Sequence, residues 1–223
     1  MMKKVGIRFL ICGISCILAF VMWTRLIQMV DVRAVGPNDT YVGFASINSW
    51  FHEMTGVHMV IYNITDWLGL VPVFICMIFG VIGLCQWVKR RSIFKVDCDI
   101  IFLGIYYIVV IAGYLIFEMV PINYRPILIE GRLEASYPSS TTLLVLSVMP
   151  TFIEQVKRRW KDSVARKLIL VLSVSFTGFM VIGRLISGVH WLTDIIGGML
   201  LSAGLFFIYK ASVSLCRKEK RRC

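Results

Sequence analysis

The sequence predicts an all-α membrane protein with six transmembrane helices and both termini on the cytoplasmic side. Of its 223 residues 58% are hydrophobic, and the mean hydropathy of +0.78 is far above that of a soluble domain. Apolar stretches recur along the chain, and a spanning helix needs about 20 such residues. Basic residues gather in short clusters between the stretches. We therefore expect a single integral membrane domain over residues 1–223.

The basic clusters set the predicted orientation and account for most of the net charge of +11. They comprise Lys3, Lys4 and Arg8; Lys89, Arg90, Arg91 and Lys95; residues 157–161 with Arg166 and Lys167; and Lys210 with residues 217–222. Their alternation along the chain is the positive-inside pattern. The basicity is thus topological: the lipid bilayer is the expected partner, and nucleic acid is not. A plasma membrane, most simply a bacterial one, is the expected location.

The first half of the chain is expected to contain three spans. Residues 5–30 form the first, a retained anchor helix that is too long for a signal peptide. Residues 31–66 form an outer connection, whose aromatic residues favour a helix lying at the membrane interface. The second span covers residues 67–88, before a cytoplasmic basic cluster, and the third covers residues 100–120.

The second half supplies the other three spans. An outer loop ends at Ser140, and the fourth span, residues 141–156, is short and contains Pro150, which predicts a bend. The fifth span covers residues 168–186 and the sixth residues 190–209. This arrangement places the polar loops before the fourth and sixth spans on the outer face, where we expect the active-site loops.

The stretch from Arg184 to Asp194, RLISGVHWLTD, carries the clearest chemical signal. His190 and Asp194 are four residues apart, so on a helix the carboxylate can reach a ring nitrogen. Such a contact fixes the imidazole tautomer and stabilises the ring when it becomes cationic. The guanidinium of Arg184 suits a phosphate. The alternative is that the three are ordinary polar residues at a helix end among lipid headgroups.

Two further polar patches lie on the same predicted side of the membrane. One is Arg125-Pro126, with Glu118 seven residues before the arginine. The other is the sequence YPSST at residues 137–141, at the start of the fourth span. Residues from several helix ends can form a single site only if those ends lie on the same side of the membrane.

These three patches resemble the motifs of the type 2 phosphatidic acid phosphatases, which share their site with vanadium haloperoxidases. The family motifs are KxxxxxxRP, PSGH and SRxxxxxHxxxD. Here the third reads GRLISGVHWLTD, with Gly183 in place of the serine, and the second reads PSST. The first keeps Arg125 and its proline but has Glu118 in place of the lysine. The resemblance covers residues 67–209, a family-like catalytic core.

The resemblance implies a role for each matching residue. His190 corresponds to the nucleophile that forms a phosphohistidine, and Asp194 to the carboxylate that orients it. Arg125 and Arg184 correspond to phosphate-binding arginines. The resemblance also implies that no metal or other cofactor takes part.

The second motif implies a phosphate cradle, with one departure. Ser139 and Ser140 stand at the start of the fourth helix, where free backbone N–H groups and the helix dipole favour an anion. Thr141, however, replaces the histidine that protonates the leaving oxygen. General acid catalysis is worth about a hundredfold to ten-thousandfold. Alternatively, Thr141 is a helix residue with no chemical task.

The first motif departs in charge. Glu118 should weaken phosphate binding if its side chain points into the site, and Arg132 from the following loop could restore the charge. Alternatively, Glu118 simply pairs with Arg125 or Arg132.

These residues predict a membrane lipid phosphatase that hydrolyses a lipid phosphate or diphosphate. A diphosphate expels a phosphate, which needs little protonation, so the missing acid favours a polyprenyl diphosphate. The alternative is that the lost proton is supplied by another group: Glu130, Glu134, Tyr124, Tyr137, His52 or His58. A second hypothesis, from a different class, is a non-catalytic relative that binds or helps to transport a lipid phosphate.

Overall fold

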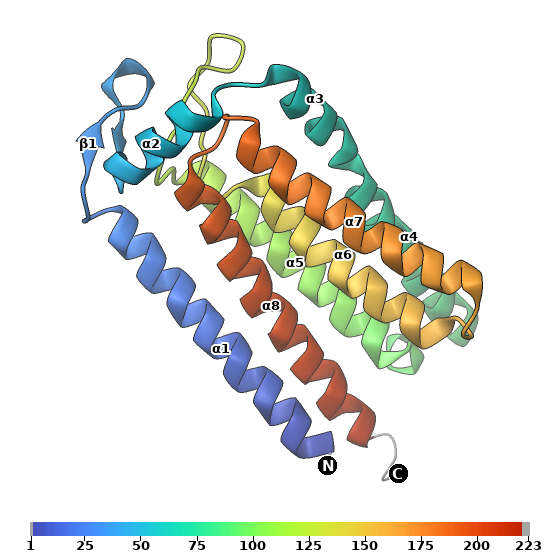
Figure 1. The fold of residues 1–223 in the computed structure, drawn as a ribbon. Helices are drawn as coiled ribbons and strands as arrows, with labels where there is room; N and C mark the ends of the chain where they lie inside the picture. The colour runs from blue at the N-terminus through green and yellow to red at the C-terminus, as the bar shows by residue number, and fades with distance from the viewer. Residues whose placement is uncertain (1, 220–223) are drawn as a thin grey trace.

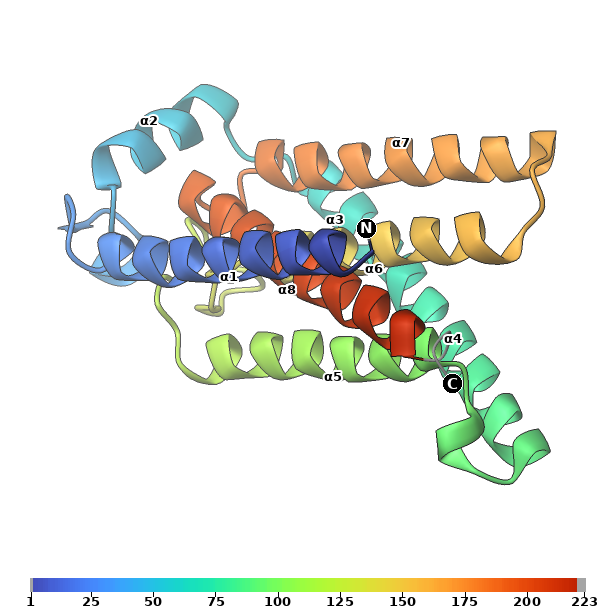
Figure 2. The same ribbon diagram turned by 90° about the horizontal axis from the view of Figure 1, so that it is seen from below.

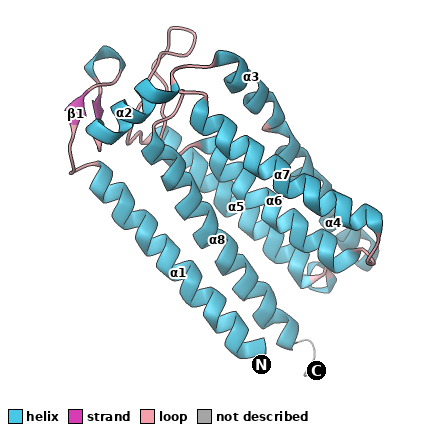
Figure 3. Ribbon diagram, viewed as in Figure 1, coloured by secondary structure: helices cyan, strands magenta, loops and turns pink. Residues whose placement is uncertain are grey.

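The computed structural model describes residues 2–219 and consists almost wholly of helices (Figures 1 and 3). Lys220 to Cys223, which include the end of the C-terminal basic cluster, lie outside the described residues. The helices are α1 (Met2–Ile27), α2 (Ala45–Thr55), α3 (Met59–Leu68), α4 (Leu70–Arg90), α5 (Cys98–Met119), α6 (Ser140–Arg159), α7 (Val164–Ile186) and α8 (Leu192–Glu219). The short strands β1 (Arg33–Ala34) and β2 (Tyr41–Val42) pair antiparallel, with Arg33 opposite Val42. Two 3₁₀ turns, η1 (Pro37–Asp39) and η2 (Ile93–Lys95), complete the described elements.

Within residues 2–219, five helical segments are long and apolar enough to cross a membrane. They are Lys4–Ile27, Met59–Arg90, Cys98–Met119, Val164–Ile186 and Leu192–Cys216. Each overlaps one of the six spans expected from the sequence. The segment without such a helix is the predicted fourth span, which corresponds to α6.

Helix α6 differs because it is buried among other helices and carries polar residues on its buried surface (Figure 2). It contacts α4, α5, α7 and α8. The phenol of Tyr107 on α5 lies 2.9 Å from the hydroxyl of Thr151, and the phenol of Tyr106 donates to the carbonyl of Ser147 at 3.2 Å. Neighbouring helices therefore satisfy these groups, and the helix continues through Pro150.

The outer connection differs in part from the expectation. Helix α2 is a separate helix, as expected for this region, but α3 begins at Met59 and leads through Gly69 into α4. The second candidate span therefore starts well before residue 67. As a result α3 packs against α7 and brings its own polar residues toward Arg184.

Close packing of α1 on α8 fixes the position of the last helix. A Cβ at Gly13 would lie 2.7 Å from Cγ1 of Ile208, and one at Gly204 would lie 2.7 Å from Cδ1 of Ile17. Small residues allow such close approach between membrane helices.

The turn from α7 into α8 also depends on glycine. Gly188 has φ +71°, and a Cβ there would clash with the carbonyl oxygen of Gly56. The carbonyl of Ser187 accepts the backbone N–H of His58 at 2.9 Å. The segment between α2 and α3 thus holds this turn in place just before His190.

Candidate active site

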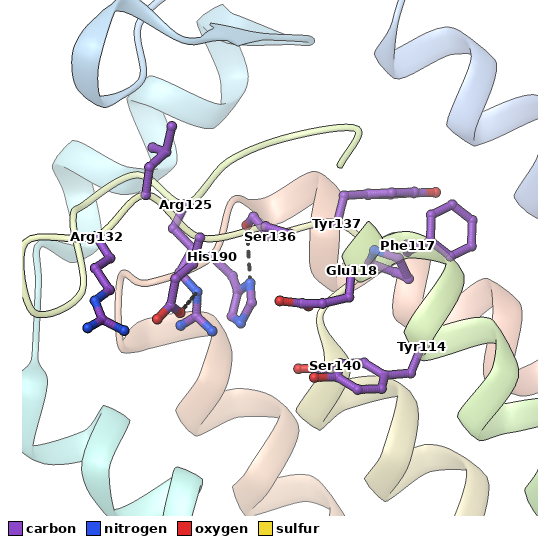
Figure 4. A pocket seen from close by; sticks show the side chains of 13 residues that line it. Tyr114, Phe117, Glu118, Arg125, Arg132, Ser136, Tyr137, Ser140 and His190 are labelled. Atoms are coloured by element: carbon purple, nitrogen blue, oxygen red, sulfur yellow. Dashed lines mark hydrogen bonds and ion pairs between the residues drawn. The ribbon is translucent and has the colours of Figure 1, made fainter. Parts of the chain in front are cut away.

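A pocket of about 430 Å³ lies at the end of the bundle where α5 ends and α6 and α8 begin (Figure 4). The loop between α5 and α6 supplies most of its wall. Of the nine residues that the sequence analysis assigned to the site itself, five line the pocket: Glu118, Arg125, Arg132, Ser140 and His190. Three patches that are far apart in the sequence therefore meet in one cavity.

His190 and Asp194 are close but do not hydrogen-bond directly. Nδ1 of His190 lies 3.9 Å from Oδ2 of Asp194, whereas hydrogen bonds of this kind span about 2.7–3.2 Å. Ser136 fills the gap: its Oγ lies 3.2 Å from Nδ1 of His190 and donates to Oδ2 of Asp194. The direct contact expected from the four-residue spacing is thus replaced by one through a serine hydroxyl.

The carboxylate of Asp194 is fully buried and held by two further donors. The backbone N–H of Trp191 donates to Oδ2 at 2.9 Å, and Nδ2 of Asn123 donates to Oδ1 at 3.3 Å. The backbone N–H of Ser139 donates to the backbone carbonyl oxygen of Asp194 at 3.1 Å. Asp194 therefore joins the loop, α6 and α8.

The imidazole of His190 is neutral at pH 7. Burial lowers the pKa of His190 to about 4; the charges of Arg125 and Arg184 lower it further, and Asp194 opposes the change. Nε2 is buried and, among residues 2–219, has no hydrogen-bond partner. A neutral imidazole whose Nδ1 faces a serine leaves Nε2 available to a ligand in the pocket.

Arg125 presents a guanidinium to the pocket with part of its hydrogen-bonding capacity unused. Nε lies 3.1 Å from Oε2 of Glu134, and buried Nη1 has no hydrogen-bond partner in the described chain. Its charge also lies over the ring of Tyr62, 5.7 Å from the centroid. An oxyanion would satisfy the unused donor.

Arg184 is buried behind the pocket and is not one of its lining residues. Its side chain is held by α3: Nη2 lies 3.1 Å from Oδ1 of Asp66, and Nη1 donates to Oγ1 of Thr65 and to the carbonyl of Tyr62, both at 3.3 Å. The guanidinium lies 4.7 Å from the centroid of the Tyr62 ring. The tyrosine ring therefore links the two arginines.

The start of α6 carries unsatisfied polar atoms. Oγ of Ser139 and Oγ1 of Thr142 are buried and lack a partner within the part of the chain that the structure describes. Ser140 opens the helix and lines the pocket, while Thr141 is buried and does not line it. Free first-turn N–H groups next to the pocket suit an anion.

Glu118 makes neither of the alternative pairs considered for it. Arg125 pairs with Glu134 instead, and no ion pair or hydrogen bond of the Glu118 side chain occurs within residues 2–219. Figure 4 shows the Glu118 side chain extending from α5 across the pocket toward His190. Arg132 lines the opposite side and is exposed.

Of the alternative proton donors, Glu134 and Tyr137 line the pocket. The phenol of Tyr137 lies 2.7 Å from Oγ1 of Thr24, on α1, and burial raises the pKa of this tyrosine. Glu130 and Tyr124 are not lining residues.

The two other histidines lie away from the pocket. The ring of His52 packs on Trp191, with 5.6 Å between centroids, and Nε2 of His58 lies 2.9 Å from the carbonyl of Thr55. Neither histidine is among the residues that line the cavity.

Comparison with known proteins identifies the family of the chain. The family model of the PAP2 superfamily matches residues 106–218, which are just over half of the chain and include all three motif regions. The chain belongs to the PAP2 superfamily. The resemblance inferred from the sequence is therefore confirmed at the level of the family, whereas comparison with curated proteins gave no match.

A transmembrane PAP2-type phosphatidylglycerolphosphate phosphatase from Bacillus subtilis has a similar crystal structure. The TM-score is 0.62 over 94% of this chain and 96% of that chain, at 17% sequence identity. The fold is thus that of a PAP2 membrane phosphatase.

One departure from the PAP2 motifs has a steric cause. A Cβ at Gly183, where the motif has serine, would lie 2.8 Å from Cγ2 of Thr65. Glycine at this position lets α3 approach α7, and that approach brings Tyr62 and Asp66 onto Arg184. This contact could not be foreseen, because Tyr62, Thr65 and Asp66 fall in the segment expected to lie at the interface.

Proposed function

We propose that this PAP2 protein is a membrane lipid phosphatase that removes a terminal phosphate from a lipid phosphate or diphosphate through a phosphohistidine at His190. The observation that carries the proposal is the imidazole itself. It is buried, neutral and backed by Ser136 and Asp194, and its Nε2 has no partner among the described residues. This combination gives a nucleophile that is ready to attack without first losing a proton.

In the proposed reaction Nε2 of His190 attacks phosphorus, and the bond from phosphorus to the lipid-borne leaving oxygen breaks. Water then attacks the phosphohistidine, which releases phosphate and regenerates the imidazole. Arg125 and the free N–H groups at the start of α6 bind the phosphoryl oxygens. Arg184 contributes charge from behind the pocket.

The substrate class follows from the missing acid. Thr141 cannot donate a proton near neutral pH, so a leaving group that departs unprotonated is favoured. The phosphate expelled from a diphosphate is such a group, whereas the alkoxide expelled from a phosphomonoester is not. We therefore propose a polyprenyl diphosphate in the outer leaflet of a bacterial plasma membrane, with the pocket facing outward.

A second candidate is a protein that binds a lipid phosphate without cleaving it. It is favoured by the carboxylates already paired with the two arginines, Glu134 on Arg125 and Asp66 on Arg184. Together with Glu118 these acidic groups reduce the attraction for a dianion.

Phosphate release by the purified full-length protein separates the two candidates. The substrates are phosphatidate, phosphatidylglycerophosphate and a polyprenyl diphosphate, each with and without chelator. We expect release to be fastest from the diphosphate and insensitive to chelator. His190→Ala should abolish release while lipid binding is retained, and His58→Gln, outside the pocket, is the matched control. No release from any lipid by the wild-type protein supports the binding function, and faster release from phosphatidate rejects the diphosphate.

A further inference from the structure

A serine that belongs to none of the three motif patterns lies between the two residues expected to act as a pair. Nδ1 of His190 and Oδ2 of Asp194 are 3.9 Å apart, and Ser136 Oγ reaches both. The three residues are at most 3% exposed. The serine is thus the hydrogen-bonded link between the carboxylate and the ring.

The donor inventory of these groups fixes the direction of the hydrogen bonds. A carboxylate only accepts, and a hydroxyl has one hydrogen to donate. The hydroxyl hydrogen of Ser136 therefore points to Asp194, and its oxygen can only accept from the ring. It follows that Nδ1 of neutral His190 carries the proton and Nε2 carries the free electron pair.

The serine is held in this position by its backbone. Its N–H donates to the carbonyl oxygen of Asn123 at 2.9 Å, and Asn123 in turn donates to Oδ1 of Asp194. The next residue along, Tyr137, is buried against Phe20 and Phe117. The backbone of Ser136 is therefore fixed, and the contacts of its hydroxyl with Asp194 and His190 hold the side chain.

We infer that Ser136 is a positioning residue of this site, which holds His190 in the tautomer with a free Nε2 and transmits the charge of Asp194 to the ring. When Nε2 becomes bonded to phosphorus the ring acquires positive charge, and Nδ1–H then donates more strongly to the serine oxygen. The polarised hydroxyl in turn donates more strongly to the carboxylate of Asp194. This inference rests on the proposed function only for its catalytic consequence; the tautomer does not depend on turnover.

The tautomer can be measured directly, because replacing the other two of the three histidines leaves His190 alone in the spectrum. In a His52→Gln/His58→Gln background, His190 provides the only imidazole signals in a ¹H–¹⁵N spectrum of the full-length protein. We expect the proton on Nδ1 in this background. Adding Ser136→Ala should move part or all of the proton to Nε2, and adding Ser136→Thr should keep it on Nδ1. Ser202→Ala is the matched control, since its buried hydroxyl donates to a carbonyl within α8.

Turnover supplies the second measurement. Ser136→Ala should lower kcat by about 10- to 100-fold with little change in KM, the rate equivalent of one hydrogen bond to a charged group. Ser136→Thr should recover most of the rate, and Ser202→Ala should match the wild type.

Two results would overturn the inference: a proton on Nε2 in the His52→Gln/His58→Gln background, or an unchanged tautomer together with an unchanged kcat in Ser136→Ala. If the wild-type protein releases no phosphate from any lipid, the proposed function fails, and the spectrum alone still decides the role of Ser136.

Discussion

The low pKa of His190 predicts activity that persists into the acid range. Its causes are the burial of the ring and, secondarily, the charges of Arg125 and Arg184. With a pKa of about 4, roughly 90% of the imidazole is neutral at pH 5, whereas an ordinary histidine with a pKa of 6.5 is only about 3% neutral. The acid limb of the pH profile of kcat/KM, which reports the free enzyme, should therefore fall near pH 4.

The same pKa predicts a loss of stability in acid. The unfolded chain binds a proton at His190 below its ordinary pKa of 6.5, but the folded protein does so only near pH 4. The contribution of His190 to stability is therefore complete above pH 6.5 and is lost as the pH falls toward 4. The full difference in the free energy of unfolding is about 3 kcal/mol. His190→Asn should remove this dependence.

Two assays test this reasoning. The first measures phosphate release from pH 4 to 8, using both a phosphomonoester and a diphosphate lipid, because ionisation of the substrate also changes over part of this range. The second compares thermal unfolding of the wild-type protein and His190→Asn at pH 7 and pH 4.5. His52→Gln is the control, since burial also lowers the pKa of His52 although its ring lies outside the pocket. An acid limb near pH 6.5 with both lipids, or an identical acid destabilisation in His190→Asn, would refute the argument.

Three further predictions concern the residues around the arginines. Glu118→Lys, which restores the lysine of the first motif, should lower the Kd for inorganic phosphate about tenfold in a competition assay. An unchanged Kd would show that Glu118 does not act on the bound anion. Gly183→Ser should destabilise the protein by about 1–3 kcal/mol in thermal unfolding, because the new side chain meets Thr65. The loss should be smaller in a Thr65→Ala background, and equal losses in both backgrounds would contradict this prediction. Asp66→Asn should free Arg184 and tighten phosphate binding several-fold, whereas loss of binding would mean that Asp66 is needed to hold the arginine in place.

The helices were predictable because their sequences are long and apolar and lie between basic clusters. Residues 164–186 and 192–216 needed no tertiary information. Helix α3 was not recognised as the start of a span, because the aromatic residues of this region favoured an interfacial helix and because Thr65 and Asp66 interrupt its apolar pattern. Those two side chains are satisfied by Arg184, a residue more than a hundred positions further along the chain.

The site was predictable where local spacing or a motif carried it. His190 and Asp194 share a helix-scale spacing, and Arg125 is marked by its proline. Ser136 could not be found in this way, because its partner His190 is 54 residues away and the hydroxyl occupies a gap that only three-dimensional packing creates. The local sign of its importance was that Ser136 directly precedes the YPSST stretch at residues 137–141.

The polar surface of α6 has a consequence for how the protein enters its membrane. A segment with several hydroxyl groups and with basic residues in its last turn gains little from hydrocarbon when it is inserted alone. During biogenesis it should remain near the translocon until α7 and α8 are available as partners. The N-terminal turn of α6, where we propose that phosphate binds, would therefore be assembled late, together with the imidazole of the same pocket.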